Sequence, residues 1–265
     1  MKRLLAAMTA ALLMAALVSN AVVAAPTFVQ ATGSIGLSAP SQYVSFNAFD
    51  YGDTGDRGTV NYTNFEYAAT GTGVWNVGGT YPLVVTYGGT YTHTMRVDTV
   101  TPISTTATTF SGTGYYVPDA SYTWTVKGMV SGSNIWFDIT YTGTMAGYVF
   151  HATGSIAADG SMSGTGTDTL GQTPLTWATP AGSAHEVLSY TASVSCAVIS
   201  GSNATFVFTI PAGFPGLSGL PVIAKVFDGG TPGTNGDTWA HGIATSACDG
   251  PVGGYAITSG NLVVH

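Results

Sequence analysis

Three aspartates in one short loop are the first residues whose types and spacing could support chemistry. Asp50, Asp53 and Asp56 stand three residues apart in a glycine-rich stretch. Carboxylate oxygens are preferred ligands of Ca²⁺, so a calcium site is one interpretation of this loop. The spacing differs from that of an EF-hand, and no glutamate follows that would bind Ca²⁺ through both oxygens. A solvated acidic turn beside Arg57 is the alternative interpretation.

A second loop near the C-terminus combines carboxylates, an amide and an indole ring. Asp228, Asn235 and Asp237 lie in it, and Trp239 follows. These side chains could contact a metal ion or a sugar. Asp and Asn also hydrogen-bond to their own backbone in turns, where glycine supplies a positive φ. A structured hairpin loop is therefore the alternative interpretation.

The histidines do not form a recognisable site in the sequence. They are His93, His151, His185, His241 and His265. Their spacing is not that of a zinc site, and no Gly-x-Ser-x-Gly motif marks a nucleophile. Members of a Ser-His-Asp triad need not be close in sequence. A hydrolase therefore remains an alternative hypothesis.

The tryptophans offer a further type of binding surface. Trp136 is expected to share a strand face with Asp138 and Thr140, and an aromatic ring beside polar groups can stack on a sugar. A second sheet covering Trp136 is the alternative. Three further tryptophans lie near predicted turns: Trp75, Trp177 and Trp239.

Residues 1–24 have the organisation of a secretory signal peptide. Lys2 and Arg3 precede an apolar run over residues 4–18, which is short for a membrane span of ~20 residues. Small residues up to Ala24 provide a cleavage site. We therefore expect a secreted protein, located outside the cell or at its surface. We expect no membrane insertion once the signal peptide is removed.

The predicted mature chain is acidic. Loss of residues 1–24 removes two of the 6 basic residues and none of the 13 acidic ones, which leaves a formal charge of −9. Such a chain lacks the basic surface that nucleic acid requires. Cys196 and Cys248 both remain, and an even cysteine count in an exported chain predicts one disulfide. Two free buried thiols are the alternative.

Alternating apolar residues predict β-strands throughout the chain, most clearly over residues 121–168. Ile135, Phe137 and Ile139 fall on one face of a strand, because successive side chains point to opposite faces. The Asp-Gly pair at 159–160 predicts a hairpin. We predict an all-β fold, an antiparallel β-sandwich or barrel-like architecture with an inserted β-meander.

Four stretches of the chain resemble one known family. They are residues 44–65, 108–114, 224–239, which contain the sequence KVFDGGTPGTNGDTW, and 258–265 with the sequence TSGNLVVH. Together they look like the post-COAP domain, a small all-β module of secreted and surface prokaryotic proteins. The turn from 228 to 237 is the most specific part. The resemblance implies fold and location but no chemistry, because that family has no catalytic residues to carry over.

The matching stretches lie on both sides of the predicted meander, which indicates a discontinuous domain. We predict a signal peptide at 1–24, the first part of a β-domain at 25–115, an inserted antiparallel β-meander at 116–183 and the second part of the β-domain at 184–265. The final strand should then pair in a sheet that contains residues from before Pro118.

We therefore expect a secreted, non-catalytic β-protein that acts as a binding or structural module. An extracellular glycan or a surface protein is the expected partner, and nucleic acid is not. No cofactor is expected, apart from Ca²⁺ at the acidic loop if that interpretation holds. A carbohydrate- or calcium-binding adhesive domain and a secreted hydrolase are the alternatives.

Overall fold

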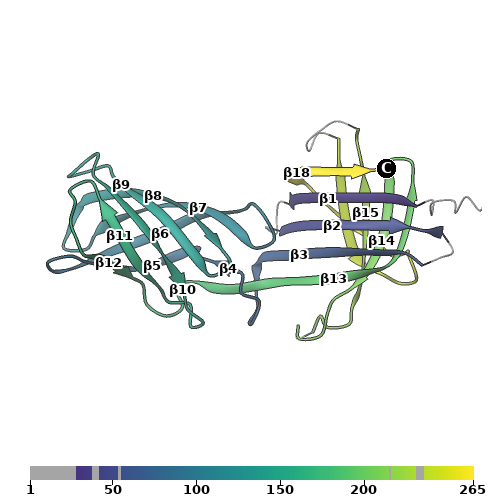
Figure 1. Ribbon diagram of the computed structural model, residues 1–265, viewed down its shortest axis with the longest axis horizontal. Helices are drawn as coiled ribbons and strands as arrows, with labels where there is room; N and C mark the ends of the chain where they lie inside the picture. The colour runs from purple at the N-terminus through teal and green to yellow at the C-terminus, as the bar shows by residue number, and fades with distance from the viewer. Residues whose placement is uncertain (1–27, 38–41, 53–54, 215, 231–235) are drawn as a thin grey trace, which may run out of the picture.

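The protein is built from β-strands and the turns between them (Figure 1). The computed structural model describes residues 28–37, 42–52, 55–214, 216–230 and 236–265. All 18 secondary-structure elements in these residues are strands, which confirms the all-β prediction. Over the same residues, no helix has the length and hydropathy needed to cross a bilayer.

One sheet joins the two ends of the described chain. Its strands follow the order β17 (Gly253–Tyr255), β16 (Thr238–Ile243), β15 (Pro221–Phe227), β14 (Asn203–Thr209), β13 (His185–Ser200), β3 (Arg57–Ala68), β2 (Gln42–Asp50), β1 (Val29–Leu37) and β18 (Ile257–Val264). A short tenth strand, β4 (Trp75–Asn76), pairs with β13.

The long strand β13 connects the two halves of this sheet. Its residues 187–193 pair with β3, and its residues 194–200 pair with β14 on the opposite edge. The sheet folds over on itself, so that β14 and β15 cross the direction of β1, β2 and β3 (Figure 1). Phe46 on β2 packs against Phe206 on β14 with ring centroids 5.0 Å apart. We call this part of the molecule the sandwich unit.

The last strand pairs where the sequence predicts. β18 is antiparallel to β1, and Leu262 lies opposite Gly33. Leu262 is buried in the core of the sandwich unit. The prediction that the end of the chain pairs with residues from before Pro118 is therefore confirmed.

The other eight strands form a closed barrel. They are β5 (Gly79–Thr86), β6 (Thr90–Pro102), β7 (Ala107–Tyr116), β8 (Asp119–Ser131), β9 (Asn134–Tyr141), β10 (Val149–Ile156), β11 (Met162–Asp168) and β12 (Leu175–Ala178). Each strand is antiparallel to the next, and β12 closes the barrel against β5. This is an up-and-down barrel, in which no strand edge is left unpaired by the closure.

The predicted boundary of the insertion is too late in the chain. Residues 79–115, assigned from the sequence to the first β-domain, form β5, β6 and all but the last residue of β7 in the barrel. The predicted meander at 116–183 supplies only β8 to β12, which would leave two open edges. Pairing of β8 with β7 and of β12 with β5 removes both edges, and eight strands make a barrel with room for side chains.

In the barrel wall, aromatic rings pack over glycines on the neighbouring strand. Gly114 on β7 lies directly opposite Trp124 on β8, and a Cβ atom at Gly114 would overlap the indole ring. Gly128 stands in the same relation to Phe110. The ring on one strand thus covers the glycine on its neighbour, and Trp124 is only 1% exposed.

His241 on β16 lies inside the sandwich unit among aromatic rings. Its ring stacks on Tyr255 with centroids 4.4 Å apart. Its Nδ1 accepts a hydrogen bond of 2.9 Å from Nε1 of Trp239, so the proton of the neutral ring is on Nε2. Burial lowers the pKa of His241 to about 4.

We expect His241 to destabilise the folded protein as the pH falls from 6.5 to about 4. Its folded pKa lies below the unfolded value, so its contribution is fully present above pH 6.5 and is lost as the pH falls towards the folded pKa. A pKa shift of this size corresponds to about 3 kcal/mol. We expect a smaller loss of stability, about 2 kcal/mol, because the ring is not completely shielded from water. Urea unfolding at a series of pH values measures it.

His241→Gln should have a shallower pH dependence than the wild type, since glutamine does not titrate. His185→Gln is the matched control, because His185 is exposed at the start of β13. An unchanged profile in His241→Gln would show that burial of this ring is not what makes the fold acid-sensitive.

Candidate functional site: a tyrosine-lined cavity in the barrel

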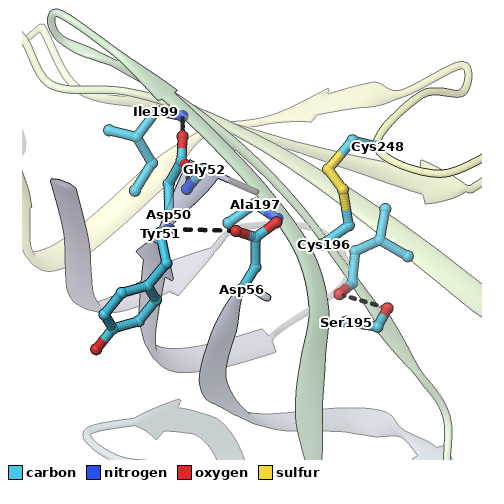
Figure 2. Close-up of a disulfide and its surroundings, with 10 residues drawn as sticks. Asp50, Tyr51, Gly52, Asp56, Ser195, Cys196, Ala197, Ile199 and Cys248 are labelled. Carbon is cyan, nitrogen blue, oxygen red and sulfur yellow. Dashed lines mark hydrogen bonds between the residues drawn. A yellow bond between two sulfur atoms is a disulfide. The ribbon is translucent and has the colours of Figure 1, made fainter. Parts of the chain in front are cut away.

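Two of the three aspartates in the first predicted site bind the protein's own backbone (Figure 2). Oδ2 of Asp50 accepts a hydrogen bond of 3.0 Å from the Ile199 amide. Oδ2 of Asp56 accepts one of 2.6 Å from the Ala197 amide. Pairing of β3 with β13 ends at Ser193, so these later amides of β13 have no strand partner on that side. The carboxylates satisfy them instead.

The calcium interpretation also depends on Asp53, which lies outside the described residues. Among the residues that the structure does describe, no group of three or more His, Cys, Asp or Glu side chains could hold a metal ion. The calcium site therefore stays a prediction, and the described geometry assigns Asp50 and Asp56 a structural role.

Asp56→Ala is expected to lower the free energy of unfolding by about 1–3 kcal/mol, because it leaves the Ala197 amide without its acceptor. The loss should be the same with a chelator present, if the carboxylate serves the backbone. Asp98→Ala is the matched control. Asp98 makes an exposed ion pair with Arg96, and such pairs contribute little. Loss of stability only in the presence of calcium would support the metal interpretation instead.

The second predicted loop is also held together by its own side chains. Oδ2 of Asp228 accepts a hydrogen bond of 2.9 Å from the Val264 amide, which ties the loop to the last strand. Oδ1 of Asp237 accepts one of 3.0 Å from the Gly229 amide. These contacts are typical of a structured hairpin loop. Asn235 lies outside the described residues.

Trp239 does not present its ring to solvent. It is 1% exposed and packs against Phe46, with centroids 5.5 Å apart, and against Phe206. The prediction that Trp239 belongs to a binding surface is wrong. Its ring cannot stack on a ligand, because side chains of β2 and β14 cover it. The sequence could not distinguish these situations, because the partner strands are distant along the chain.

One of the other predicted tryptophans is accessible. Trp136 is 39% exposed on the outer face of the barrel, whereas Trp75 and Trp177 are buried. Near it, Nδ1 of His151 lies 2.6 Å from Oδ1 of Asp138, and both side chains are exposed. A pair on a convex surface does not enclose a substrate.

A further candidate site was not predicted from the sequence. It is a cavity of about 390 Å³ inside the barrel. The turn between β6 and β7 contacts the sandwich unit, because Thr63 donates a hydrogen bond of 2.6 Å to the Thr105 carbonyl oxygen. The cavity lies at the opposite end of the barrel, which we call the distal end and which is farthest from the sandwich unit in Figure 1.

Tyrosines form the upper wall of this cavity. They are Tyr87, Tyr91, Tyr116, Tyr122, Tyr141 and Tyr148. Each of three distal turns, β5–β6, β7–β8 and β9–β10, is flanked by two of them. The rings of the three pairs have centroids 4.6, 6.2 and 5.2 Å apart. The repeated pair at every second turn was visible in the sequence, but only the barrel register brings the pairs together.

Apolar side chains form the floor. They are Leu83, Val85, Ile139 and Phe150, which point inward from β5, β9 and β10. The fourth distal turn, between β11 and β12, adds Leu170 and Gln172 to the wall. At the mouth, Leu170 is 62% exposed and Met145 is 44% exposed. The cavity is therefore apolar at its base and aromatic above it, and exposed apolar side chains border its mouth.

Two polar contacts order the wall. The Tyr148 hydroxyl donates a hydrogen bond of 2.7 Å to Oδ2 of Asp168. The Tyr141 hydroxyl lies 3.2 Å from Nε2 of His93. Asp168 is itself held by the Leu170 amide at 2.9 Å, so the carboxylate has a fixed position behind the tyrosine.

Burial favours the neutral forms of three titratable groups in the wall, Tyr141, Tyr148 and His93. Burial raises the pKa of Tyr141 to about 12. Burial also raises the pKa of Tyr148, and the hydrogen bond to Asp168 raises it further. Burial lowers the pKa of His93, against an opposing effect from the carbonyl oxygens of Leu83 and Tyr91. At neutral pH these two phenols and this imidazole are therefore uncharged.

No protein-family model matches this chain, and no curated protein matches it. One solved structure, a redesigned beta barrel, is similar with a TM-score of 0.30 and 18% sequence identity. The similarity covers 39% of this chain and 89% of that chain. A TM-score this low supports no statement about function. The fold and the cavity define the class: a two-unit all-β protein with a cavity in its barrel.

Proposed function

We propose that this is an exported, non-catalytic binding protein whose barrel holds a small organic molecule in the distal cavity. The observation that carries the proposal is the cavity itself. Its volume of about 390 Å³ falls within the range of ~300–1,000 Å³ that is usual for ligand pockets. An apolar floor with a few polar groups is also the usual composition of such pockets.

The disulfide supports the exported location. Cys196 and Cys248 are bonded, with Cα atoms 5.7 Å apart, as the sequence predicts. Disulfides are typical of oxidising compartments. Export itself rests on the proposed signal peptide at 1–24, which lies outside the described residues.

The lining of the cavity favours binding over catalysis. Its residues, all in the described part of the chain, include no Ser, Thr, Cys or Lys that could act as a nucleophile. His93 is the one histidine among them, and its Nε2 is engaged with Tyr141. A hydrolase would need a nucleophile within reach of a base.

We further propose that the sandwich unit attaches the protein to an extracellular layer, through a glycan or a surface protein. Three of the four stretches that resemble the post-COAP domain lie in this unit, and this resemblance supports the role. The cavity opens at the end of the barrel farthest from the sandwich unit, so attachment there would leave the mouth accessible (Figure 1).

Titration with tryptophol, a neutral indole with a two-carbon alcohol arm, tests the binding proposal. We expect saturable binding of one molecule per chain with a Kd of roughly 1 mM or tighter, given the modest affinity per atom of small ligands. Ligand-observed NMR is sensitive enough for this range. Linear, non-saturable broadening at the same concentrations would contradict the proposal.

A further inference from the structure

The hydroxyl of Tyr141 offers an acceptor to the cavity, because its proton is already engaged. Nε2 of His93 lies 3.2 Å from this hydroxyl. Nδ1 of His93 is buried and makes no hydrogen bond among the described residues, and the carbonyl oxygens of Leu83 and Tyr91, which can only accept, lie near the ring. We infer from these acceptors that the ring proton is on Nδ1. Nε2 is then the acceptor of the Tyr141 proton. The lone pairs of the Tyr141 oxygen remain for a ligand.

Two more oxygens of the wall have the same character. The Tyr148 proton is donated to Asp168 at 2.7 Å, so its oxygen can only accept from a ligand. Oε1 of Gln172 is buried and has no hydrogen-bond partner among the described residues. A buried acceptor without a partner is unfavourable. A ligand that donates hydrogen bonds would satisfy it.

The charges around the cavity have one sign. None of the described residues that line it is Lys or Arg. Asp119 lies at the mouth, and Asp168 lies directly behind Tyr148. A cation in the cavity would therefore be attracted by two carboxylates and repelled by no like charge. An anion would be repelled by both carboxylates and attracted by no positive charge.

The aromatic rings add to this preference. The faces of tyrosine rings carry partial negative charge and attract ammonium groups, most strongly where water is excluded. Six tyrosines line this cavity, and the ring of His93 lies 5.3 Å from that of Tyr116. The apolar floor below them would hold an uncharged ring or alkyl group.

We propose that the cavity selects protonated organic amines that carry an aromatic or other apolar body. This inference rests on the proposed binding function and names its ligand class. The ammonium group donates hydrogen bonds to the oxygens of Tyr141, Tyr148 and Gln172 in the tyrosine wall. The body of the ligand lies on the apolar floor.

Three probes with the same indole and two-carbon arm test the proposal. They are tryptamine, a cation at pH 7.4, neutral tryptophol, and anionic indole-3-propionate. We expect tryptamine to bind at least about tenfold more tightly than tryptophol, from cation–π contacts alone. Indole-3-propionate should bind most weakly. Asp168→Asn should reduce the preference for tryptamine over tryptophol, because it removes one of the two carboxylates.

The outcomes separate this inference from the proposed function. Equal affinity for tryptamine and tryptophol, with both lost in a Val85→Trp variant that fills the cavity floor, overturns the amine selectivity and leaves the binding function intact. If indole-3-propionate binds most tightly of the three probes, the amine selectivity is likewise overturned and the binding function is left intact. Absence of saturable binding for all three probes overturns both proposals. If Asp168→Asn does not fold, Tyr148→Phe serves in its place, because it removes one acceptor oxygen and keeps the ring.

Discussion

Reduction of the Cys196–Cys248 disulfide is expected to lower the free energy of unfolding of the sandwich unit by about 4 kcal/mol. The bond closes a loop of 52 residues that contains β14, β15 and β16. Cutting it restores conformational freedom to the unfolded chain and leaves the folded strands in place. Cys196 lies where the register of β13 shifts, and Figure 2 shows its bond to Cys248.

Urea unfolding with and without reductant measures this effect. Fluorescence is a suitable signal, because the buried Trp239 reports on the core of the sandwich unit. The double variant Cys196→Ser with Cys248→Ser is the control, and its stability should not depend on reductant. Equal stability of the oxidised and reduced wild type would contradict the constraint attributed to this bond.

Val85→Trp is expected to weaken binding of the indole probes at least about 100-fold, or about 2.7 kcal/mol. Val85 lies on the cavity floor and is 6% exposed, so a larger ring at this position occupies the space of the ligand. The empty cavity of about 390 Å³ can take the added ring, so the barrel should still fold. Titration of tryptamine into both proteins gives the ratio of Kd values.

Val84→Trp is the matched control for this experiment. Val84 is the preceding residue of β5, and its side chain points to the other face of the strand. The same substitution there should leave probe affinity within about twofold of the wild type, because the added ring lies outside the cavity. Equal weakening by both variants would place the bound probe outside the barrel.

Local sequence patterns were sufficient to predict the strands and two long-range links. Alternation along residues 121–168 predicts β8 to β11, and the Asp-Gly pair at 159–160 lies at the turn between β10 and β11. The disulfide was predicted from the cysteine count, and the pairing of the last strand in a sheet with residues from before Pro118 was predicted from the family resemblance. Each of these two predictions depends on only a few residues, so it could be made from the sequence.

Closure of the barrel could not be predicted in the same way. It depends on Thr86 of β5 lying opposite Thr176 of β12, and neither residue differs in type from the other threonines on the outer face. Without this pairing, the residues of β5, β6 and β7 fitted a continuous first domain equally well. The boundary at 116 was wrong for that reason.

The candidate site depends on the same closure. The six tyrosines are spread from Tyr87 to Tyr148, and their pairs at turns match no binding motif along the chain. Their position at turns is local information, but their convergence requires that these turns lie at one end of one barrel. The roles of Asp50 and Asp56 are similarly hidden, since they follow from the point at which β3 stops pairing with β13.

NMR titration of the methyl-labelled protein with tryptamine tests the central claim most directly. The account predicts that shifts concentrate at the methyl groups that line the cavity: Leu83, Val85, Ile139 and Met145. Methyl groups of the sandwich core, such as those of Leu262, should not move. Shifts confined to residues around Trp136 on the outer face, or to the sandwich unit, would contradict a binding site inside the barrel.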